Sequence, residues 1–259
     1  MQDQLRISII QTNTIWKNTS RNLLEIEKKI NQTPKKTDLI ILPEMFTTGF
    51  VMQPQGVAQA MDGLVVKWMK KISKEKNFAI CGSVAIEEKG AYFNRFVFVN
   101  SRGEMFCYDK KHLFGPMGEN EVYSSGLKRI VFEYKGWKIA PFICYDLRFP
   151  VWSRNTENYD IAIYTANWPK VRVSSWNSLL KARAIENMCY CIGVNRVGTD
   201  VNGLEYAGQS QAINSLGEII KKASANSEAV LSVCVNKRNL IAIRKEYPFL
   251  GDRDIFKME

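Results

Sequence analysis

Two nearly continuous apolar runs constrain the fold of this chain most strongly. DLIILPE (Asp38–Glu44) and DIAIYTAN (Asp160–Asn167) have few polar residues in their interiors. A strand with apolar side chains on both faces is typical of a parallel sheet that is buried on both sides. Because one such run occurs in each half of the chain, the sequence predicts two similar strand–helix–strand halves packed into one body.

Shorter patterns complete both halves. Helical periodicity covers 18–30, Leu64 to Ile72 with Asp62 as the candidate N-cap, 174–188 and 237–246. Strands are expected at 5–11, 78–86, 92–99, 105–108, 130–134, 137–144, 189–197, 208–214, 218–222 and 229–235. No linker or low-complexity tract interrupts them. We therefore expect a single α/β domain over residues 1–259, with two sheets face to face and helices outside.

Composition excludes several classes of protein. The 259 residues are 46% hydrophobic and 24% charged, which is ordinary for a globular domain. The longest apolar run, Phe78–Ile86, is far shorter than the roughly 20 residues of a membrane span. The N-terminus lacks the features of a secretion signal. We expect a cytoplasmic protein with six reduced cysteines and no membrane partner.

No metal or cofactor is expected, because the chain has no CxxC pair and only one histidine, His112. The net charge of +10 raises the question of nucleic-acid binding. The lysines, however, are scattered along amphipathic helices, which favours a basic solvated surface and no nucleic-acid partner. A positive potential would favour small anionic substrates.

Three places break the local pattern, and the first is ILPEMFTTGF. Glu44 ends an apolar strand there and is followed by a turn. Active sites of α/β folds gather at strand ends, so a carboxylate at this position could exchange protons with a substrate. On pattern alone, a strand that simply leaves the core for water is the commoner arrangement.

The second place is YDKKHLFGPMGENEVY (Tyr108–Tyr123). Side chains alternate on a strand, so Lys110 and Lys111 cannot face the same way. An ammonium group that points into a pocket could stabilise a developing oxyanion. A solvated lysine pair is nevertheless the commoner arrangement.

The third place is PFICYDLRFP, where Cys144 stands at a strand-to-helix transition. Free cysteine is usually a small buried hydrophobe. On such a turn, however, a nucleophile is exposed, following backbone N–H groups can form an oxyanion hole, and the helix N-terminus favours the thiolate. Because His112 is the only histidine, a Cys–Glu–Lys set is more economical than a histidine-dependent one.

The segments LPEMF, DKKHLF and ICYDLRFP, in this order, resemble the signatures of the nitrilase or carbon–nitrogen hydrolase superfamily. The similarity runs from Leu5 to the C-terminus and includes NWP, KARAIEN and NRVG. Within the superfamily the chain is most similar to the bacterial omega-amidases, which hydrolyse the terminal amide of 2-oxoglutaramate and 2-oxosuccinamate. The resemblance implies an α-β-β-α four-layer sandwich of the nitrilase type that forms a homodimer.

The resemblance also implies roles for particular residues. Cys144 would be the nucleophile, Glu44 its base, and Lys111 and the backbone N–H of Tyr145 the oxyanion donors. Glu119 would orient the substrate and the lysine. Arg148 would bind the distal carboxylate of the substrate, or instead form a structural salt bridge with Asp146 or Glu157. Phe46 and Trp168 are candidates for the pocket wall. Ser175 stands where many relatives have histidine.

Two other functions remain open from the sequence. Another member of the superfamily, such as a nitrilase, a carbamoylase or a different aliphatic amidase, would use the same three catalytic residue types. A catalytically silent, basic binding protein is the alternative outside the enzymes.

Overall fold

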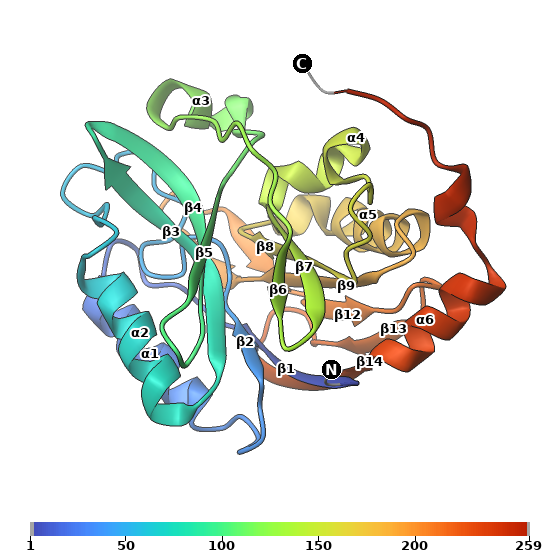
Figure 1. Ribbon diagram of the computed structural model, residues 1–259. Helices are drawn as coiled ribbons and strands as arrows, with labels where there is room; N and C mark the ends of the chain where they lie inside the picture. The colour runs from blue at the N-terminus through green and yellow to red at the C-terminus, as the bar shows by residue number, and fades with distance from the viewer. Residues whose placement is uncertain (1–2, 258–259) are drawn as a thin grey trace.

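Two six-stranded sheets pack face to face in the computed structural model, which describes residues 3–257 (Figure 1). The first sheet has the order β14-β1-β2-β3-β4-β5. Its strands are β1 (Gln4–Gln11), β2 (Leu39–Ile41), β3 (Ala79–Glu88), β4 (Ala91–Val99), β5 (Met105–Asp109) and β14 (Ala229–Asn236). The second sheet has the order β13-β12-β9-β8-β7-β6. Its strands are β6 (Phe132–Tyr134), β7 (Trp137–Ile143), β8 (Ile161–Ala166), β9 (Tyr190–Asn195), β12 (Gln211–Ile213) and β13 (Ile219–Lys222).

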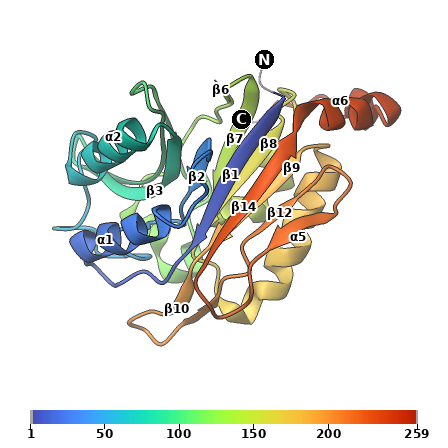
Figure 2. The same cartoon turned by 90° about the horizontal axis from the view of Figure 1, so that it is seen from below.

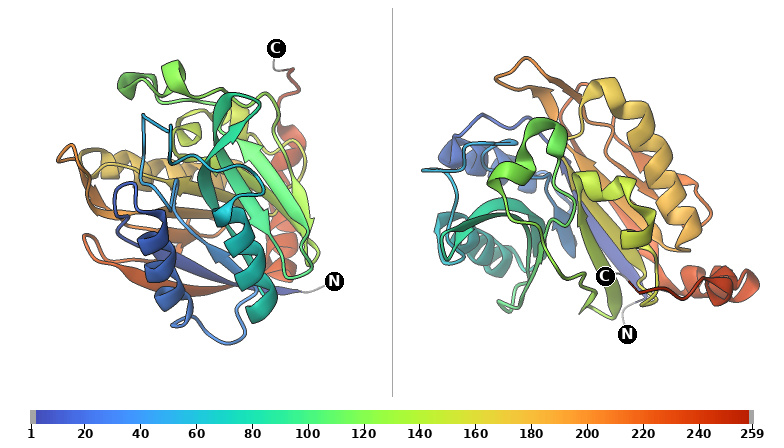
Figure 3. Two further views of the ribbon diagram at one scale, coloured as in Figure 1. Left: turned by 90° about the vertical axis from the view of Figure 1, so that its left-hand side faces the viewer. Right: turned by 90° about the horizontal axis from the view of Figure 1, so that it is seen from above.

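Helices form the two outer layers. α1 (Thr19–Ile30) and α2 (Leu64–Lys76) lie side by side on the first sheet, and α5 (Val173–Glu186) lies on the second (Figures 2 and 3). α6 (Lys237–Glu246) follows β14. Shorter elements complete the chain: α3 (Glu119–Val122), α4 (Pro150–Ser153), and the 3-10 turns η1 (Gly115–Met117), η2 (Cys144–Arg148), η3 (Lys170–Arg172) and η4 (Phe249–Asp252). The predicted four-layer sandwich is therefore confirmed.

The two halves have the same central topology. β1, β2 and β3 run parallel in the first sheet, as β7, β8 and β9 do in the second. Antiparallel strands flank each parallel set, with β14 and β4 on one sheet and β6 and β12 on the other. The carboxyl ends of the parallel strands are the places where α/β folds build their sites.

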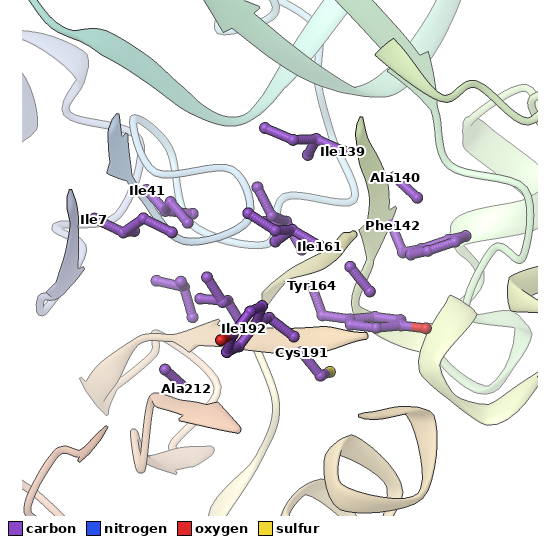
Figure 4. Packing of buried hydrophobic residues seen from close by; sticks show 14 of the residues in the cluster. Ile7, Ile41, Ile139, Ala140, Phe142, Ile161, Tyr164, Cys191, Ile192 and Ala212 are labelled. Carbon is purple, nitrogen blue, oxygen red and sulfur yellow. The ribbon is translucent and has the colours of Figure 1, made fainter. Parts of the chain in front are cut away.

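Alternation along the strands divides the apolar residues between two interfaces. Ile7 and Ile41 point toward the second sheet, where they join the cluster that includes Ile139 and Ile161 (Figure 4). The side chains that alternate with them along the strands point to the opposite face of the sheet. There they pack against α1 and α2, including Trp68 of α2. Each fully buried side chain of this size contributes about 1.5–3 kcal/mol, so both interfaces hold the sandwich together. This explains why β2 and its surroundings are apolar throughout.

Two local expectations were wrong, and one element was not expected. Asp62 does not cap α2, because Gly63 occupies the N-cap position and provides no side-chain hydrogen bond. Cys144 opens the five-residue 3-10 turn η2, and no α-helix begins there. The hairpin of β10 (Val197–Thr199) and β11 (Glu205–Ala207) forms a separate small sheet that the sequence did not predict.

Within residues 3–257, no helix combines the length and the apolar character that crossing a membrane would need.

An ion-pair cluster at Asp38 joins the two sheets. Its carboxylate accepts hydrogen bonds from the backbone N–H and the guanidinium of Arg6 on β1, and it pairs with Lys135 in the β6–β7 turn. Burial works against ionisation, but the bonds to Arg6 and Lys135 outweigh it and lower the pKa of Asp38 to about 2. The charged carboxylate therefore stabilises the folded state.

Replacing Asp38 with Asn is expected to lower the free energy of unfolding at neutral pH by about 2 kcal/mol. The pKa of Asp38 is depressed on folding, so its contribution is fully present above the unfolded-state pKa and is lost as the pH falls toward 2. Urea unfolding at neutral pH and at about pH 3 measures this difference. Asp62→Asn, which removes an exposed carboxylate, is the control. An equal loss at both pH values would contradict a role for the charge.

Candidate active site

Five chain segments bring polar side chains to one end of the sandwich. Glu44 follows β2, Cys144 follows β7 and Asn167 follows β8, so all three stand just beyond the carboxyl ends of parallel strands. Lys110 follows β5, and Glu119 opens the short helix α3. Because these strands belong to both sheets, the site lies where the two halves of the chain meet.

A buried ammonium group lies between two buried carboxylates. The Lys110 Nζ is 2.9 Å from Glu44 Oε1 and 2.8 Å from Glu119 Oε2, and none of the three side chains is exposed. Burial lowers the pKa of Lys110, but Glu119 and Glu44 outweigh it and hold the pKa above its ordinary value. Burial raises the pKa of Glu119; Lys110 opposes this shift and Glu44 adds to it. Lys110 therefore remains a cation beside the two carboxyl groups.

The structure corrects the choice of lysine. Lys111 was expected in the site, but its Nζ lies 5.4 Å from the ring centroid of Trp152, and its side chain is only half-buried. Lys110 points inward because it follows Tyr108 by two positions and so faces the same way. Tyr108 is turned toward the second sheet, where its hydroxyl donates to Asp146.

Two polar residues that the sequence analysis missed hold the carboxylates. Asn94 Nδ2 on β4 donates to Glu44 Oε1 at 2.8 Å and to Glu119 Oε1 at 3.1 Å. Ser83 on β3 donates to Asn94 Oδ1, which fixes the amide with its NH₂ group toward the acids. Both residues are fully buried in strands that are mostly apolar, and this is the signal that could have identified them.

Asn167 completes the surroundings of Glu44. Its backbone N–H donates to Glu44 Oε2 at 2.8 Å, and its Nδ2 donates to the Glu44 backbone carbonyl at 2.9 Å. Its own backbone carbonyl lies 3.9 Å from the sulfur of Cys144. Asn167 thus links Glu44 to the thiol.

Cys144 occupies a strained position at the strand end. Its φ of 45° lies in the left-handed region, and its half-buried side chain lines a pocket. Burial, followed by the Glu44 carboxylate, raises the pKa of Cys144 well above its usual value, and Lys110 offsets this only in part. The turn that begins at Cys144 is a short 3-10 element, so the sulfur lacks the helix N-terminus that was expected to favour its thiolate. Because its pKa is raised, the sulfur needs a base in order to react.

Asp146 fastens this turn to the end of β5. Fully buried, it accepts hydrogen bonds from the backbone N–H of Ile143 and of His112, from His112 Nδ1 and from the Tyr108 hydroxyl. Asp146 is therefore committed to these four donors, which excludes the structural salt bridge with Arg148 that the sequence left open. Glu157, the other candidate partner of Arg148, pairs with Arg129.

A pocket lies beside Cys144. Tyr145, Arg148 and Trp168 line it, as do Lys110 and Asn167. The wall also contains residues that the sequence analysis did not propose, namely Phe50, Phe114, Met117, Pro169, Arg172, Leu204 and Tyr206.

Phe46 is not part of the wall, contrary to expectation. It is fully buried under α2, with its ring centroid 6.3 Å from that of Trp68. Phe50, at the end of the same turn, takes the place expected for Phe46, and its ring centroid is 5.2 Å from Lys110 Nζ.

Comparison with known proteins defines the class. The family model of the carbon–nitrogen hydrolases matches residues 6–245, and the chain belongs to this family. It is accordingly a hydrolase of carbon–nitrogen bonds.

Named relatives extend over nearly the whole chain. The chain is 41% identical over 254 residues to omega-amidase YafV of Escherichia coli K12, covering 98% of both chains. It is 31% identical to the 2-oxoglutaramate amidase of Bacillus subtilis, covering 95% of this chain and 96% of that one. Among solved structures, XC1258 of Xanthomonas campestris, a CN-hydrolase superfamily protein with an arsenic adduct in its active site, superposes with a TM-score of 0.97. That protein is 37% identical, and each chain is covered completely.

Proposed function

We propose that this chain is a thiol amidohydrolase that cleaves the terminal amide of small 2-oxo acid amides, such as 2-oxoglutaramate and 2-oxosuccinamate. The observation that carries the proposal is a thiol, Cys144, that lines a pocket next to the Glu44–Lys110–Glu119 cluster. The similarity to omega-amidase YafV and to the 2-oxoglutaramate amidase supports the substrate class.

In the first half of the reaction, Glu44 accepts the proton of Cys144 while the sulfur attacks the amide carbonyl carbon. The carbonyl oxygen becomes an oxyanion, which Lys110 Nζ and the backbone N–H of Tyr145 stabilise. The tetrahedral intermediate then collapses. Its C–N bond breaks, the nitrogen takes the proton from Glu44, and ammonia leaves, so that a thioester remains on Cys144.

In the second half, Glu44 takes a proton from a water molecule, whose oxygen attacks the thioester. Collapse of the second intermediate breaks the C–S bond, and Glu44 returns the proton to the sulfur. The products are the dicarboxylate and the free thiol. Glu119 positions Lys110 and does not need to exchange a proton, which fits its hydrogen bonds to Lys110 and to the backbone N–H of Phe114.

Arg148 is the proposed partner of the distal carboxylate. Its side chain is exposed at the pocket, and its Cζ lies 5.0 Å from the ring centroid of Trp168. A guanidinium can bind a carboxylate through two parallel N–H···O bonds. The ring of Trp168 would hold this fork at the pocket wall.

The experiment is a substrate panel with detection of released ammonia. We expect 2-oxoglutaramate and 2-oxosuccinamate to be hydrolysed with a kcat/KM far above that for L-glutamine, a simple aliphatic nitrile or an N-carbamoyl amino acid. Preference for the nitrile or the carbamoyl compound would assign the chain to another activity of the family. No hydrolysis of any of them would favour the silent binding protein.

Replacing Arg148 with Ala is expected to lower kcat/KM for 2-oxoglutaramate by about 10- to 100-fold, chiefly through KM, because a charge-assisted hydrogen-bonded pair contributes about 1.5–3 kcal/mol. Steady-state kinetics with 2-oxoglutaramate and with pentanamide, which has no carboxylate, measure the effect. An unchanged value for 2-oxoglutaramate would show that Arg148 does not bind the carboxylate.

We further propose that the whole chain is one domain that works in the cytoplasm as a homodimer. The span of the family match supports the single domain. Light scattering coupled to size-exclusion chromatography tests the dimer, and a monomer at micromolar concentration would reject it.

A further inference from the structure

A second arginine lines the pocket next to Cys144. Arg172 ends the turn η3, immediately before α5, and its Cζ lies 5.3 Å from the ring centroid of Phe114. Phe114 belongs to the segment after β5, whereas Trp168, which holds Arg148, follows β8. The two guanidinium groups therefore rest on aromatic side chains from different segments of the wall.

Among the residues that the structure describes, neither guanidinium has an acidic partner. Within residues 3–257, no carboxylate lies within salt-bridge distance of Arg148 or of Arg172, and the described pocket lining includes no Asp or Glu. Arg95, by contrast, pairs with Glu88 and Asp109. Two unpaired cations at one pocket create a strong preference for an anion.

Hydrogen bonds connect the two arginines. Arg148 Nη2 donates to Ser175 Oγ at 3.3 Å, and that hydroxyl donates to the backbone carbonyl of Arg172 at 2.8 Å. Trp168 Nε1 donates to the same carbonyl at 2.8 Å. Ser175, the residue that stands where many relatives have histidine, therefore connects the Arg148 side chain to the start of α5. The Arg148 guanidinium is therefore tied to the backbone that carries Arg172.

We propose that Arg172 is a second specificity-determining residue, which binds the 2-oxo acid end of the substrate together with Arg148. This inference rests on the proposed function. A 2-oxo acid end presents three oxygen acceptors, two on the carboxylate and one on the ketone, and no donor. Guanidinium groups present only donors. When one guanidinium binds the carboxylate through two parallel hydrogen bonds, the other is free to donate to the ketone oxygen and to compensate the negative charge of the carboxylate.

The pair also explains how an amino acid amide would be rejected. L-Glutamine has an ammonium group where the 2-oxo acid amide has its ketone. That group has no acceptor for a guanidinium, and it would lie next to two positive charges with no carboxylate in the described pocket lining to compensate it. Arg172 thereby sets the preference for the oxo acid over the amino acid.

Arg172→Gln tests the inference through ratios of kcat/KM. We expect the ratio for 2-oxoglutaramate over pentanamide, and the ratio over L-glutamine, each to fall at least tenfold, whereas Arg172→Lys retains part of the preference. Lys170→Gln is the matched control, because Lys170 is an exposed neighbour that pairs with Glu205 outside the pocket lining. Unchanged ratios in Arg172→Gln would overturn the inference.

A binding measurement separates this inference from the proposed function. 2-Oxoglutarate has the same 2-oxo acid end but no amide, so it should protect Cys144 from alkylation by iodoacetamide. We expect the half-protecting concentration to rise at least tenfold in Arg172→Gln. If the wild-type enzyme released no ammonia from 2-oxoglutaramate, the proposed function would be wrong. The protection of Cys144 by 2-oxoglutarate would still test whether Arg172 binds the 2-oxo acid end. Equal protection of both proteins, or none of the wild type, would overturn the inference.

Discussion

Replacing Lys110 with Met is expected to lower kcat/KM for 2-oxoglutaramate by about 10²–10³-fold, whereas Lys111→Met should stay within threefold of the wild type. The two lysines are adjacent in the chain, but only Lys110 contacts Glu44 and Glu119. The neighbouring variant is thus a matched control for the loss of one lysine. Steady-state kinetics of ammonia release measure both.

Loss of Lys110 also leaves two buried carboxylates without their cation, which costs stability of about 3–5 kcal/mol. The double variant Lys110→Met/Glu119→Gln removes one charge of each sign and keeps the net charge of the cluster. If this folded double variant regained wild-type turnover, Lys110 would be a structural cation only. If Lys111→Met were the inactive variant, the assignment of the inward lysine would be wrong.

Replacing Glu44 with Gln is expected to lower kcat by about 10²–10⁴-fold, because an amide cannot take the proton of Cys144. The pKa of that thiol is raised, so without a base the sulfur remains protonated near neutral pH. Single-turnover measurements with 2-oxoglutaramate should show slow formation of the thioester. Turnover near the wild-type value would remove Glu44 as the base.

The control for Glu44→Gln is Glu121→Gln, which replaces an exposed glutamate two positions after Glu119. In Glu44→Gln, the new side-chain amide would have to turn its NH₂ group either toward Lys110 and Asn94 or toward the N–H groups of Asn167. Some loss of thermal stability is therefore expected, and a melting curve establishes that the measured protein is folded.

The regular helices and strands could be predicted because the pattern of apolar residues along the sequence indicates which faces are buried. Strands such as β2 and β8 are covered on both faces, and their continuous apolar composition follows directly from this position. The β10–β11 hairpin could not be predicted in this way, because it packs on the rim of the sandwich and its strands have only three residues each. Its residue Tyr206 nevertheless forms part of the pocket wall.

The residue types of the site could be predicted from the sequence, but the directions in which the side chains point could be predicted only in part. Strand alternation required that one of the two lysines point inward. That lysine is Lys110, because it faces the same way as Tyr108, and Tyr108 contacts Asp146 across the sheets. This contact could not be known from the sequence. Phe46 and Phe50 belong to an irregular turn, where Met45 has a φ of 43°. No period relates side-chain direction to sequence there, so the pocket wall could not be assigned.

The most direct test is a crystal structure of the Cys144→Ala variant with 2-oxoglutaramate bound. We predict the amide carbonyl oxygen within hydrogen-bond distance of Lys110 Nζ and the backbone N–H of Tyr145, with its carbon next to residue 144 and the oxo acid end at the arginines. A substrate whose amide lay away from Lys110 and residue 144 would contradict the account.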